Sequence, residues 1–367
     1  MNRNLVEQTA RRLAVVIASA AIVAGGCAAP SRAVPEHGVL ARSTHPAVAV
    51  PPGSVTIAAV GDAMLGDTPV LTARPAHYLD HVRGALLAPI TFGNLEGTLT
   101  TATRSKCGSG SPNCFAFRVP PRYAGYLRDA GFDVLNSANN HSHDFGATGL
   151  AQTSAALRAH GIRQSGLRGQ IALVTRGPTS AAFVGFAPYT SVSNLLRLRT
   201  AAALIRTADS KADLVVVYMH AGAEGADKQH VTGREEFFLG EDRGNPERFA
   251  HMAVRNGADL VIASGPHVLR GMEIFHHHLI AYSLDDFCSY HNFNTGGVLG
   301  LSAVLRVTIG PHGWFRTGRI VSVKLNGPGR PGYDASRASA RLIGKLSRQD
   351  FGARAVRVLA DGRIVQR

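Results

Sequence analysis

The chain has 367 residues, of which 45% are hydrophobic and 17% are charged, and its formal net charge is +14. This composition excludes a disordered chain and suits one large globular domain or two of moderate size. The excess of positive charge favours an anionic partner, such as nucleic acid, anionic lipid or an acidic polymer. The alternative is that these residues form a solvated basic surface without a partner. Because no nucleic-acid motif is present and basic residues are not interleaved with aromatic ones, we expect no specific nucleic-acid binding.

The first 27 residues have the order of an export signal. Basic residues up to Arg12 precede an apolar run from Leu13 to Val23, and small residues follow up to Cys27. The run is too short to span a membrane comfortably, so we predict a signal peptide over residues 1–27. The segment Ala24–Cys27 resembles a lipoprotein cleavage box, which predicts either a lipid anchor on Cys27 or simple secretion. We therefore expect an exported protein of the cell envelope.

Residues 28–53 are rich in Pro, Ala, Ser and His and lack periodicity, which predicts a flexible linker. The first strand-like run of a folded domain follows, from Val55 to Val60. Similar runs occur at Leu214–Tyr218 and Leu260–Ala263. Each run leads directly to polar residues.

Helical segments alternate with these runs. Residues Pro121–Ala130 and Gly149–His160 have apolar side chains at helical spacing, and each segment stops at a glycine. A third helix begins at Asn245-Pro246-Glu247, because Asn caps it, Pro takes the first position and Glu meets the positive end of the helix dipole. Such alternation predicts an α/β fold.

The last part of the chain contains a strand-like stretch, Gly297–Leu325, with turns at residues 310–313. Residues 327–367 mix basic side chains with Ser, Ala and Gly. We predict a basic C-terminal tail there, with one amphipathic helix from Ala335 to Leu346 and no catalytic role.

Three cysteines follow Cys27. Cys107 and Cys114 bracket the turn-forming sequence Gly-Ser-Gly-Ser-Pro-Asn. In an exported protein this spacing predicts a local disulfide; the alternative is a thiolate metal site, which would require two further ligands. Cys288 would remain unpaired as a buried thiol.

Six polar clusters follow strand-like runs. Strands that end at one edge of an α/β sheet bring such clusters to a common crevice, where ligands bind. Imidazole and carboxylate groups suit first-row transition ions, so the set predicts a dinuclear metal site. The clusters are Gly61-Asp62, Gly93–Glu96, Asn139–His141, His220 with Glu224, Gly265–His267 and Asp285-Asp286.

These clusters resemble the CapA-type family, named for poly-γ-glutamate capsule synthesis, within the calcineurin-like metallophosphoesterases. The resemblance extends from about Val55 to about Val323, and its most specific part is Ala-Asn-Asn-His from Ala138. It implies a four-layer α/β/β/α sandwich over residues 54–326. The other motifs that carry it are Gly-Asp-Ala-Met-Leu-Gly from Gly61, Phe-Gly-Asn-Leu-Glu-Gly from Phe92, His-Ala-Gly-Ala-Glu from His220, Gly-Ala-Asp-Leu-Val-Ile from Gly257 and Tyr-Ser-Leu from Tyr282.

The resemblance also implies roles for individual residues. One or two divalent ions, Mn, Fe or Zn, would be bound, with Glu96 as the bridging ligand. His141 would act beside the metals as a general acid or would orient the scissile group, and Glu224 is the second catalytic candidate. Asn94, Asp144 and Glu224 are candidates for orienting the ligands through hydrogen bonds. The predicted metal ligands are Asp62, Glu96, Asn140, His220 and His267.

The chain departs from the family pattern at several positions. Met64 replaces the His of an Asp-x-His motif, and Gly265 replaces the first His of His-Pro-His. Asp286 is either a replacement oxygen ligand for the missing imidazole or a solvated loop residue. Separately, Gly265→His is expected to raise the affinity for Zn. The run His276–His278 is predicted to be a solvent-facing hairpin tip.

Three functions fit these observations. The first is an exported protein that helps to make, transport or anchor an anionic envelope polymer, with poly-γ-glutamate implied by the resemblance. The second is a metal-dependent phosphoesterase. The third is a non-catalytic scaffold that binds the polymer through the same fold. A metal-dependent hydrolase is favoured over the scaffold because the ligand set is largely present.

Overall fold

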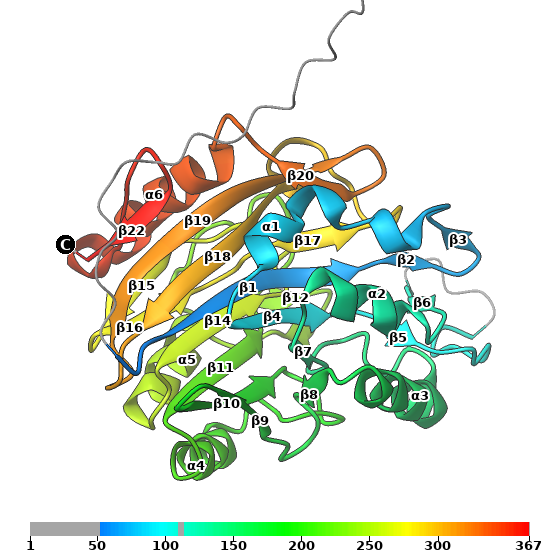
Figure 1. Ribbon diagram of the computed structural model, residues 1–367, viewed down its shortest axis with the longest axis horizontal. Coiled ribbons are helices and arrows are strands. Elements are labelled where there is room, and N and C mark those ends of the chain that lie inside the picture. Colours follow the sequence, from blue (N-terminus) through cyan, green and yellow to red (C-terminus); the bar gives the residue numbers. More distant parts are fainter. Residues whose placement is uncertain (1–51, 109–113, 367) are drawn as a thin grey trace, which may run out of the picture. The chain divides into compact units, whose positions relative to one another are not determined.

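The computed structural model describes residues 52–108 and 114–366 (Figure 1). The predicted export signal, Cys27 and the linker up to residue 51 lie outside the described residues. Within the two described ranges, no helix is both long enough and apolar enough to cross a membrane.

The larger of the two main sheets has ten strands. Its order is β21-β22-β19-β18-β1-β4-β7-β8, with β17 also paired to β1 and β20 to β19. Figure 1 shows β19, β18, β1 and β4 side by side. The strands are β1 (Val55–Met64), β4 (Ile90–Leu95), β7 (Val134–Asn136), β8 (Arg163–Ser165), β17 (Asp286–Ser289), β18 (Leu301–Ile309), β19 (Phe315–Asn326), β20 (Arg330–Tyr333), β21 (Arg357–Val358) and β22 (Arg363–Val365).

The smaller main sheet has six strands in the order β15-β16-β14-β11-β10-β9. Strands β10, β11, β14 and β16 run parallel, so their carboxyl ends lie at one edge. The strands are β9 (Ala172–Arg176), β10 (Thr179–Phe186), β11 (Leu214–His220), β14 (Leu260–Ser264), β15 (Met272–Phe275) and β16 (His278–Ala281). The predicted hairpin tip is confirmed for His276 and His277, which form the exposed turn between β15 and β16, but His278 is a half-buried residue of β16.

Short elements complete the fold. Three two-stranded ribbons form from β2 (Gly66–Asp67) with β3 (Val70–Leu71), β5 (Thr98–Leu99) with β6 (Arg118–Val119), and β12 (Phe237–Phe238) with β13 (Glu241–Asp242). The helices are η1 (Pro75–His77), η2 (Asp80–Val82), α1 (Arg83–Leu86), α2 (Tyr123–Ala130), α3 (Gly146–Ala159), α4 (Leu198–Asp209), α5 (Pro246–Arg255), η3 (Gly297–Gly300), α6 (Ala338–Phe351) and η4 (Gly352–Arg354).

Three groups of buried apolar side chains define four layers. The first group lies between the two sheets and joins residues such as Ile57 of β1 and Val216 of β11. The second covers the other face of the larger sheet, where α2 contributes Leu127. The third covers the outer face of the smaller sheet, where α4 and α5 contribute Ile205 and Phe249. The predicted α/β/β/α sandwich is therefore confirmed.

The three helices predicted before residue 260 are found, and the starts of the first two are shifted by two or three residues. The segments predicted to end at Ala130 and His160 correspond to α2 and α3, whose observed ends lie at or next to these residues. At α5 the expected cap is present: the Asn245 side chain accepts a hydrogen bond from the Arg248 N–H at 2.9 Å, and Pro246 takes the first position. Local sequence therefore sets this helix start.

The C-terminal residues are not a tail, and this prediction is corrected. Strand β20 pairs with β19, and β22 pairs with β19 through Gly318 and Ile364. Helix α6 is longer than the predicted Ala335–Leu346 and buries Ile343 in the core group between the sheets. Its buried face also includes Ser339 and Ser347. These small polar residues weaken the apolar periodicity, so composition alone suggests a tail.

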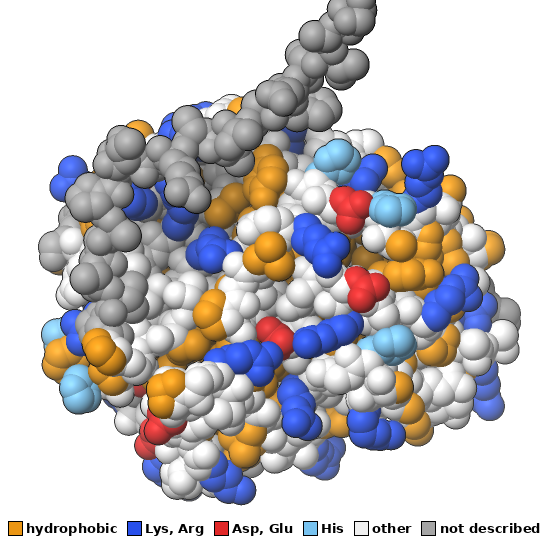
Figure 2. All heavy atoms as spheres, in the orientation of Figure 1, with side chains coloured by type: hydrophobic (Ala, Val, Ile, Leu, Met, Phe, Trp, Pro, Cys, Tyr) orange, Lys and Arg blue, Asp and Glu red, His pale blue; other side chains and the backbone are white. Residues whose placement is uncertain are grey.

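Basic side chains are spread over the face of the molecule drawn in Figure 2. Figure 2 shows Lys and Arg distributed across one face, with few acidic side chains between them. The positive charge on this face is thus not concentrated in a single stripe of the kind that typically follows a nucleic-acid backbone.

Strand β17 positions the candidate site beside β1. Strand β18 pairs with residues 55–59 of β1, and β17 then pairs in parallel with Asp62–Met64. Gly61 permits this change, because a Cβ at this position would lie 1.8 Å from the Asp285 carbonyl oxygen. The Asp62 N–H donates to the same oxygen at 2.9 Å. As a result, Asp62 and Asp286 are register partners.

Candidate metal centre

Asp62 lies where the carboxyl ends of strands from both sheets meet. Its carboxylate is fully buried, and Oδ1 accepts a hydrogen bond from Asn94 Nδ2 at 2.7 Å. Ser264 Oγ and Tyr218 Oη donate to the same oxygen. The other oxygen, Oδ2, has no hydrogen-bond partner among the described residues. Three donors therefore fix the carboxylate and leave one oxygen available as a ligand.

Asn94 joins Asp62 to the loop that follows β7. Its side-chain oxygen accepts hydrogen bonds from Asn136 Nδ2 at 2.6 Å and from Asn139 Nδ2 at 3.0 Å. The Asn139 side-chain oxygen in turn accepts the His141 N–H at 3.0 Å. This network connects Asp62 on one side with the segment that carries Asn140 and His141 on the other.

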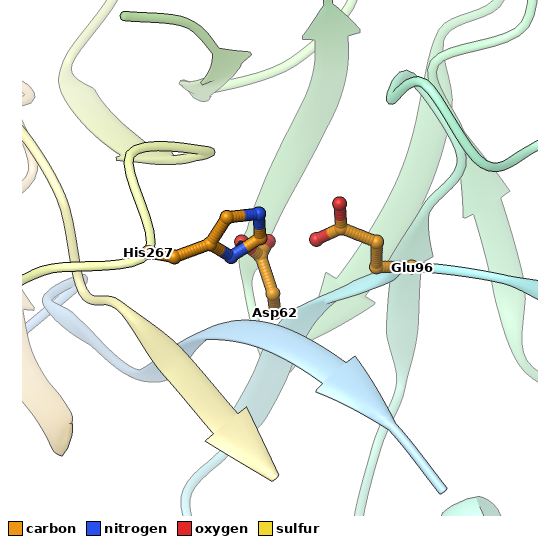
Figure 3. A group of neighbouring side chains, drawn as sticks. All are labelled: Asp62, Glu96 and His267. Carbon is orange, nitrogen blue, oxygen red and sulfur yellow. Dashed lines mark ion pairs between the residues drawn. The ribbon is translucent and has the colours of Figure 1, made fainter. Parts of the chain in front are cut away.

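Glu96 follows β4 and points its carboxylate into the same space. It is 1% exposed, and neither of its carboxylate oxygens has a hydrogen-bond partner in the described parts of the chain. Figure 3 shows the Asp62 and Glu96 carboxylates and the His267 imidazole pointing toward one another. Ligand atoms of these three residues all lie within 4.8 Å of one another.

His220 brings a further donor atom to Glu96, and Asn140 precedes His141 in the loop after β7. His220 ends β11, and its Nε2 lies 3.6 Å from Glu96 Oε1. Neither His220 Nε2 nor Asn140 Oδ1 has a hydrogen-bond partner among the residues described. Burial, followed by the positive charge of Arg243, holds the pKa of His220 well below its ordinary value. A neutral imidazole is the form that binds a metal.

His267 is held by Asp286. Its Nδ1 lies 2.7 Å from Asp286 Oδ1, and both side chains are buried. Burial alone would lower the pKa of His267, but the Asp286 carboxylate raises it well above its ordinary value. Phe293 stacks on the ring, with centroids 4.5 Å apart. The structure therefore corrects one of the two alternatives for Asp286: this residue is a buried hydrogen-bond partner of His267 and not a solvated loop residue.

These donor atoms fit a divalent cation. Burial raises the pKa of Asp62, and burial together with the Asp62 charge raises the pKa of Glu96 well above its ordinary value. Native proteins seldom leave buried oxygens unpaired, and a cation would satisfy them and stabilise their charge. The unpaired donor atoms of this set are Asp62 Oδ2, Glu96 Oε1, Glu96 Oε2, Asn140 Oδ1 and His220 Nε2.

His141 faces this group from the loop after β7. Its Nε2 lies 4.0 Å from Glu96 Oε1, and its Nδ1 lies 2.8 Å from Asp144 Oδ2. Asp144 is fully buried. The carboxylate therefore holds one ring nitrogen and leaves the other directed at the centre, a geometry suited to proton transfer.

Glu224 lies at the edge of the group. Its Oε2 is 3.9 Å from His267 Nε2, and its Oε1 accepts a hydrogen bond from Arg243 Nη2 at 2.8 Å. Arg243 is 4% exposed and lies over the rings of Tyr189 and Phe238. This pairing fixes Glu224 beside the candidate ligands.

Sequence reasoning missed several contributors. Tyr218 precedes His220 by two residues on the same face of β11, so strand alternation alone could have pointed to it. Ser264 ends β14 three residues before His267. Arg243 carries no recognisable signal, because it follows a short ribbon whose place beside the site depends on the tertiary fold.

The two cysteines predicted to pair are joined. Cys107 and Cys114 form a disulfide with their Cα atoms 5.4 Å apart. Cys288 is the free cysteine of the described residues and is buried. Burial raises the pKa of its thiol. Both predictions are confirmed.

Comparison with known proteins places the chain in a family. The model of the family described as bacterial capsule synthesis protein PGA_cap matches residues 56–291, more than half of the chain. The chain belongs to the PGA_cap family. All five predicted metal ligands, together with His141, Glu224 and Asp286, lie within the part of this PGA_cap protein that the model matches.

Curated relatives match a smaller part. The PGA biosynthesis protein CapA of Bacillus subtilis is 28% identical over 178 residues, which cover 44% of this chain and 43% of the relative. The capsule biosynthesis protein CapA of Bacillus anthracis is 28% identical over 181 residues, covering 44% and 41%. The match thus spans less than half the length of either CapA protein.

Two solved structures align at lower similarity. The Haemophilus influenzae NAD nucleotidase has a TM-score of 0.39 and 14% identity, with 80% of this chain and 55% of that chain covered. A 5′-nucleotidase precursor from Thermus thermophilus has the same TM-score and identity, with 73% and 54% covered. A similarity of this size supports no conclusion about activity.

Proposed function

We propose that this PGA_cap protein uses a metal centre to act on an anionic polymer of the bacterial cell envelope during capsule biosynthesis. Poly-γ-glutamate is the polymer that the family resemblance implies. The observation that carries the proposal is the convergence of buried donor atoms from Asp62, Glu96 and His220, of which Asp62 Oδ2, both Glu96 oxygens and His220 Nε2 have no hydrogen-bond partner among the described residues. Their positions coincide with the motifs by which the chain resembles its relatives.

The residues that would hold the metal follow from the geometry. Asp62, Glu96 and His267 would bind one divalent ion, since their ligand atoms lie within 4.8 Å of one another. His220, whose Nε2 lies 3.6 Å from Glu96 Oε1, and Asn140, whose Oδ1 has no hydrogen-bond partner among the described residues, would supply further ligands to this ion or to a second one. A bound divalent ion supplies positive charge and Lewis acidity to an anionic substrate.

The neighbouring side chains would handle protons and orientation. His141 would donate or accept a proton through Nε2, because its Nδ1 is held by Asp144. Glu224, fixed by Arg243, would orient His267 or accept a proton from the substrate. Asp286 would keep the His267 ring in one orientation.

The place of action proposed is outside the cytoplasm. The predicted signal over residues 1–27 would export the chain, and Cys27 would carry a lipid or be removed with the signal. Anchoring at the membrane surface would hold the folded domain near a growing envelope polymer. Mass spectrometry of the mature protein tests this step: a species that still begins at Met1 would contradict the cleavage.

Metal analysis is the direct test of the centre. The full chain is purified from its native compartment and measured by elemental analysis, beside a Glu96→Gln variant. One or two equivalents of Mn, Fe or Zn in the parent, and a loss in the variant, are expected. A parent that remains free of metal even after loading with each ion would overturn the metal centre and favour a polymer-binding scaffold.

Polymer turnover is measured separately. The metal-loaded protein is incubated with poly-γ-glutamate, and chain length and binding are followed by size-exclusion chromatography. Binding or cleavage that depends on Glu96 is expected. If the polymer is neither bound nor altered, the polymer assignment is wrong, whatever the metal content.

A plain phosphoesterase is the second candidate. It is favoured by His141, whose Nε2 faces Glu96 while Asp144 holds its other nitrogen, because this arrangement suits protonation of a leaving oxygen. Hydrolysis of bis(p-nitrophenyl) phosphate by the metal-loaded parent, and its loss in His141→Ala, would favour this activity over polymer chemistry.

A further inference from the structure

A disulfide-closed loop contacts the residues that orient His141. The loop connects β5 to β6, and the Cys107–Cys114 bond closes its central part. Lys106 precedes the first cysteine, and Phe117 lies three residues after the second. Both residues reach Asp144.

The Asp144 carboxylate receives a contact from each side of the disulfide. Lys106 Nζ lies 2.7 Å from Asp144 Oδ1 as an ion pair, and the Phe117 N–H donates to Asp144 Oδ2 at 2.6 Å. The Lys106 N–H also donates to the Asp144 carbonyl at 2.7 Å. Asp144 is fully buried, whereas the Lys106 side chain is 36% exposed. The lysine thus brings a positive charge from the surface to a buried carboxylate, which otherwise would be costly to bury.

The same contacts extend to His141 and Asn140. Asp144 Oδ2 accepts both the Phe117 N–H and the His141 Nδ1 contact at 2.8 Å. Lys106 Nζ donates to the Asn140 carbonyl at 3.0 Å. The Phe117 ring lies against the His141 ring, with centroids 4.5 Å apart. The loop therefore touches the His141 segment through charge, hydrogen bonds and ring packing.

We propose that Lys106, held in place by the Cys107–Cys114 bond, is a positioning residue for His141. It fixes Asp144, which keeps His141 Nδ1 bonded and directs Nε2 toward the metal centre. This inference rests on the proposed function only for the role of His141 in turnover; the orientation of the ring is independent of it. The disulfide thereby contributes to the geometry of the site and not solely to the stability of a surface loop.

Nuclear magnetic resonance of the imidazole nitrogens tests the orientation directly. In the parent, ¹⁵N shifts of His141 are expected to show one tautomer, protonated at Nδ1. Lys106→Met keeps the length of the side chain but removes its charge, and is expected to give a mixture of tautomers. Lys106→Arg keeps the charge and should retain the parent pattern. The double variant Cys107→Ser with Cys114→Ser should shift the same resonances as Lys106→Met.

Lys228→Met is the matched control. Lys228 also pairs with a single aspartate, Asp227, but both side chains are exposed and the contact is confined to adjacent residues. Its loss should leave the His141 resonances unchanged. Parent-like His141 shifts in both Lys106→Met and the double cysteine variant would overturn the proposal, as would an equal change in Lys228→Met.

Turnover gives a second reading. With a substrate that the parent hydrolyses, Lys106→Met is expected to lower kcat by about 10-fold or more with little change in KM, as for other residues that orient a functional side chain. Arginine should restore most of kcat. If the parent hydrolyses nothing, the proposed enzymatic function fails, but the ring measurement still decides the role of Lys106.

Discussion

Two clusters of carboxylates and imidazoles in this fold have the spacing of a metal site, yet they differ in how their oxygens are satisfied. One is Asp62, Glu96 and His267; the other is Glu247, His251 and Glu273. In the first, both oxygens of Glu96 are unpaired among the described residues. In the second, Glu273 Oε1 contacts His251 Nε2 at 2.6 Å and accepts the Tyr282 hydroxyl at 2.7 Å.

The second cluster already contains its cation. Arg354 Nε lies 2.5 Å from Glu273 Oε2, and Arg354 Nη2 lies 2.8 Å from Glu247 Oε1. Burial would raise the pKa of Glu273, but its contacts with His251, Tyr282 and Arg354 lower it below the ordinary value. In the candidate metal centre, by contrast, burial raises the pKa of Glu96. Spacing alone does not separate a ligand site from a structural network; unpaired buried oxygens do.

The largest difference between the two clusters is expected in the effect of a substitution on metal affinity. Replacing Glu96 with Gln removes the carboxylate that Asp62, His220 and His267 surround. The loss should exceed the roughly 10–100-fold that follows removal of an orienting partner. Titration calorimetry with Mn²⁺ and Zn²⁺ measures it. Glu273→Gln is the control and should bind as the parent does; an equal loss in both variants would erase the distinction.

For stability we expect the opposite result: the Glu273 variant, which hardly changes metal affinity, should lower the free energy of unfolding. Glu273→Gln leaves His251, Tyr282 and Arg354 incompletely satisfied, so the free energy of unfolding should fall by about 1–3 kcal/mol. Urea unfolding measures the change. Glu235→Gln removes a surface partner of Arg248 and should cost less than about 1 kcal/mol. A Glu273 variant as stable as the Glu235 variant would show that the network contributes little.

A carboxylate–imidazole pair occurs in each cluster, and Asp286 sharpens the comparison. Asp286→Asn keeps the shape but weakens the hold on His267, so metal affinity should fall by about 10-fold. Calorimetry beside Glu96→Gln distinguishes the two roles of Asp286. A loss as large as that of Glu96→Gln would make Asp286 a ligand, and an unchanged affinity would remove it from the site.

The smallest effect expected is a pH dependence of stability in a chelator. Glu96 has a folded-state pKa raised above that of the unfolded chain, so the folded protein binds more protons between the two values. His267 changes the stability in the same direction: because its pKa is raised in the folded state, it contributes stability that is lost as the pH rises through that pKa. Burial lowers the pKa of His220, so this residue has the opposite effect: it reduces the stability as the pH falls. The effect occurs only below about pH 6.5.

The melting temperature in chelator should therefore fall as the pH rises above about 6.5, the ordinary pKa of histidine. With saturating Mn²⁺ the fall should disappear, because ligand ionisation then favours binding. Differential scanning fluorimetry measures both series. If the melting temperature changes with pH by the same amount with and without metal, the ionisation of these groups is not coupled to cation binding.

Local signals in the sequence predicted the α/β class and the polar residues that follow the strands, whereas the four layers were implied by the family resemblance. Asp62, His220 and His267 all lie at or just after apolar strand runs, and Asn245 caps its helix through its own side chain. The disulfide was predictable from the short spacing of its cysteines. None of these inferences required knowledge of which strands are neighbours.

The rest depends on contacts between distant segments. Nothing near Asp286 in sequence indicates that its carboxylate pairs with His267, and nothing near Glu273 indicates Arg354. Gly265 shows the same limit. Its φ is +113°, and a Cβ would lie 3.3 Å from the His220 ring. A histidine there would be strained against His220, so the structure gives no support to the expected gain in Zn affinity.

The parallel pairing of β17 with β1 joins segments that lie far apart in the sequence, so we expect this pairing to form late in folding. Asp62 lies near the start of the folded domain, while Asp286 arrives late in the chain, and their strands join only after this long loop closes. Contacts between residues so far apart in sequence form slowly, because the chain loses the entropy of loop closure before any favourable contact energy is gained. Until β17 docks, Asp62 lacks the Asp285 carbonyl that fixes its backbone, and His267 lacks Asp286. We therefore expect assembly of the complete centre to be a late step, because a nascent chain that ends before residue 285 lacks the Asp286 carboxylate that contacts His267 Nδ1.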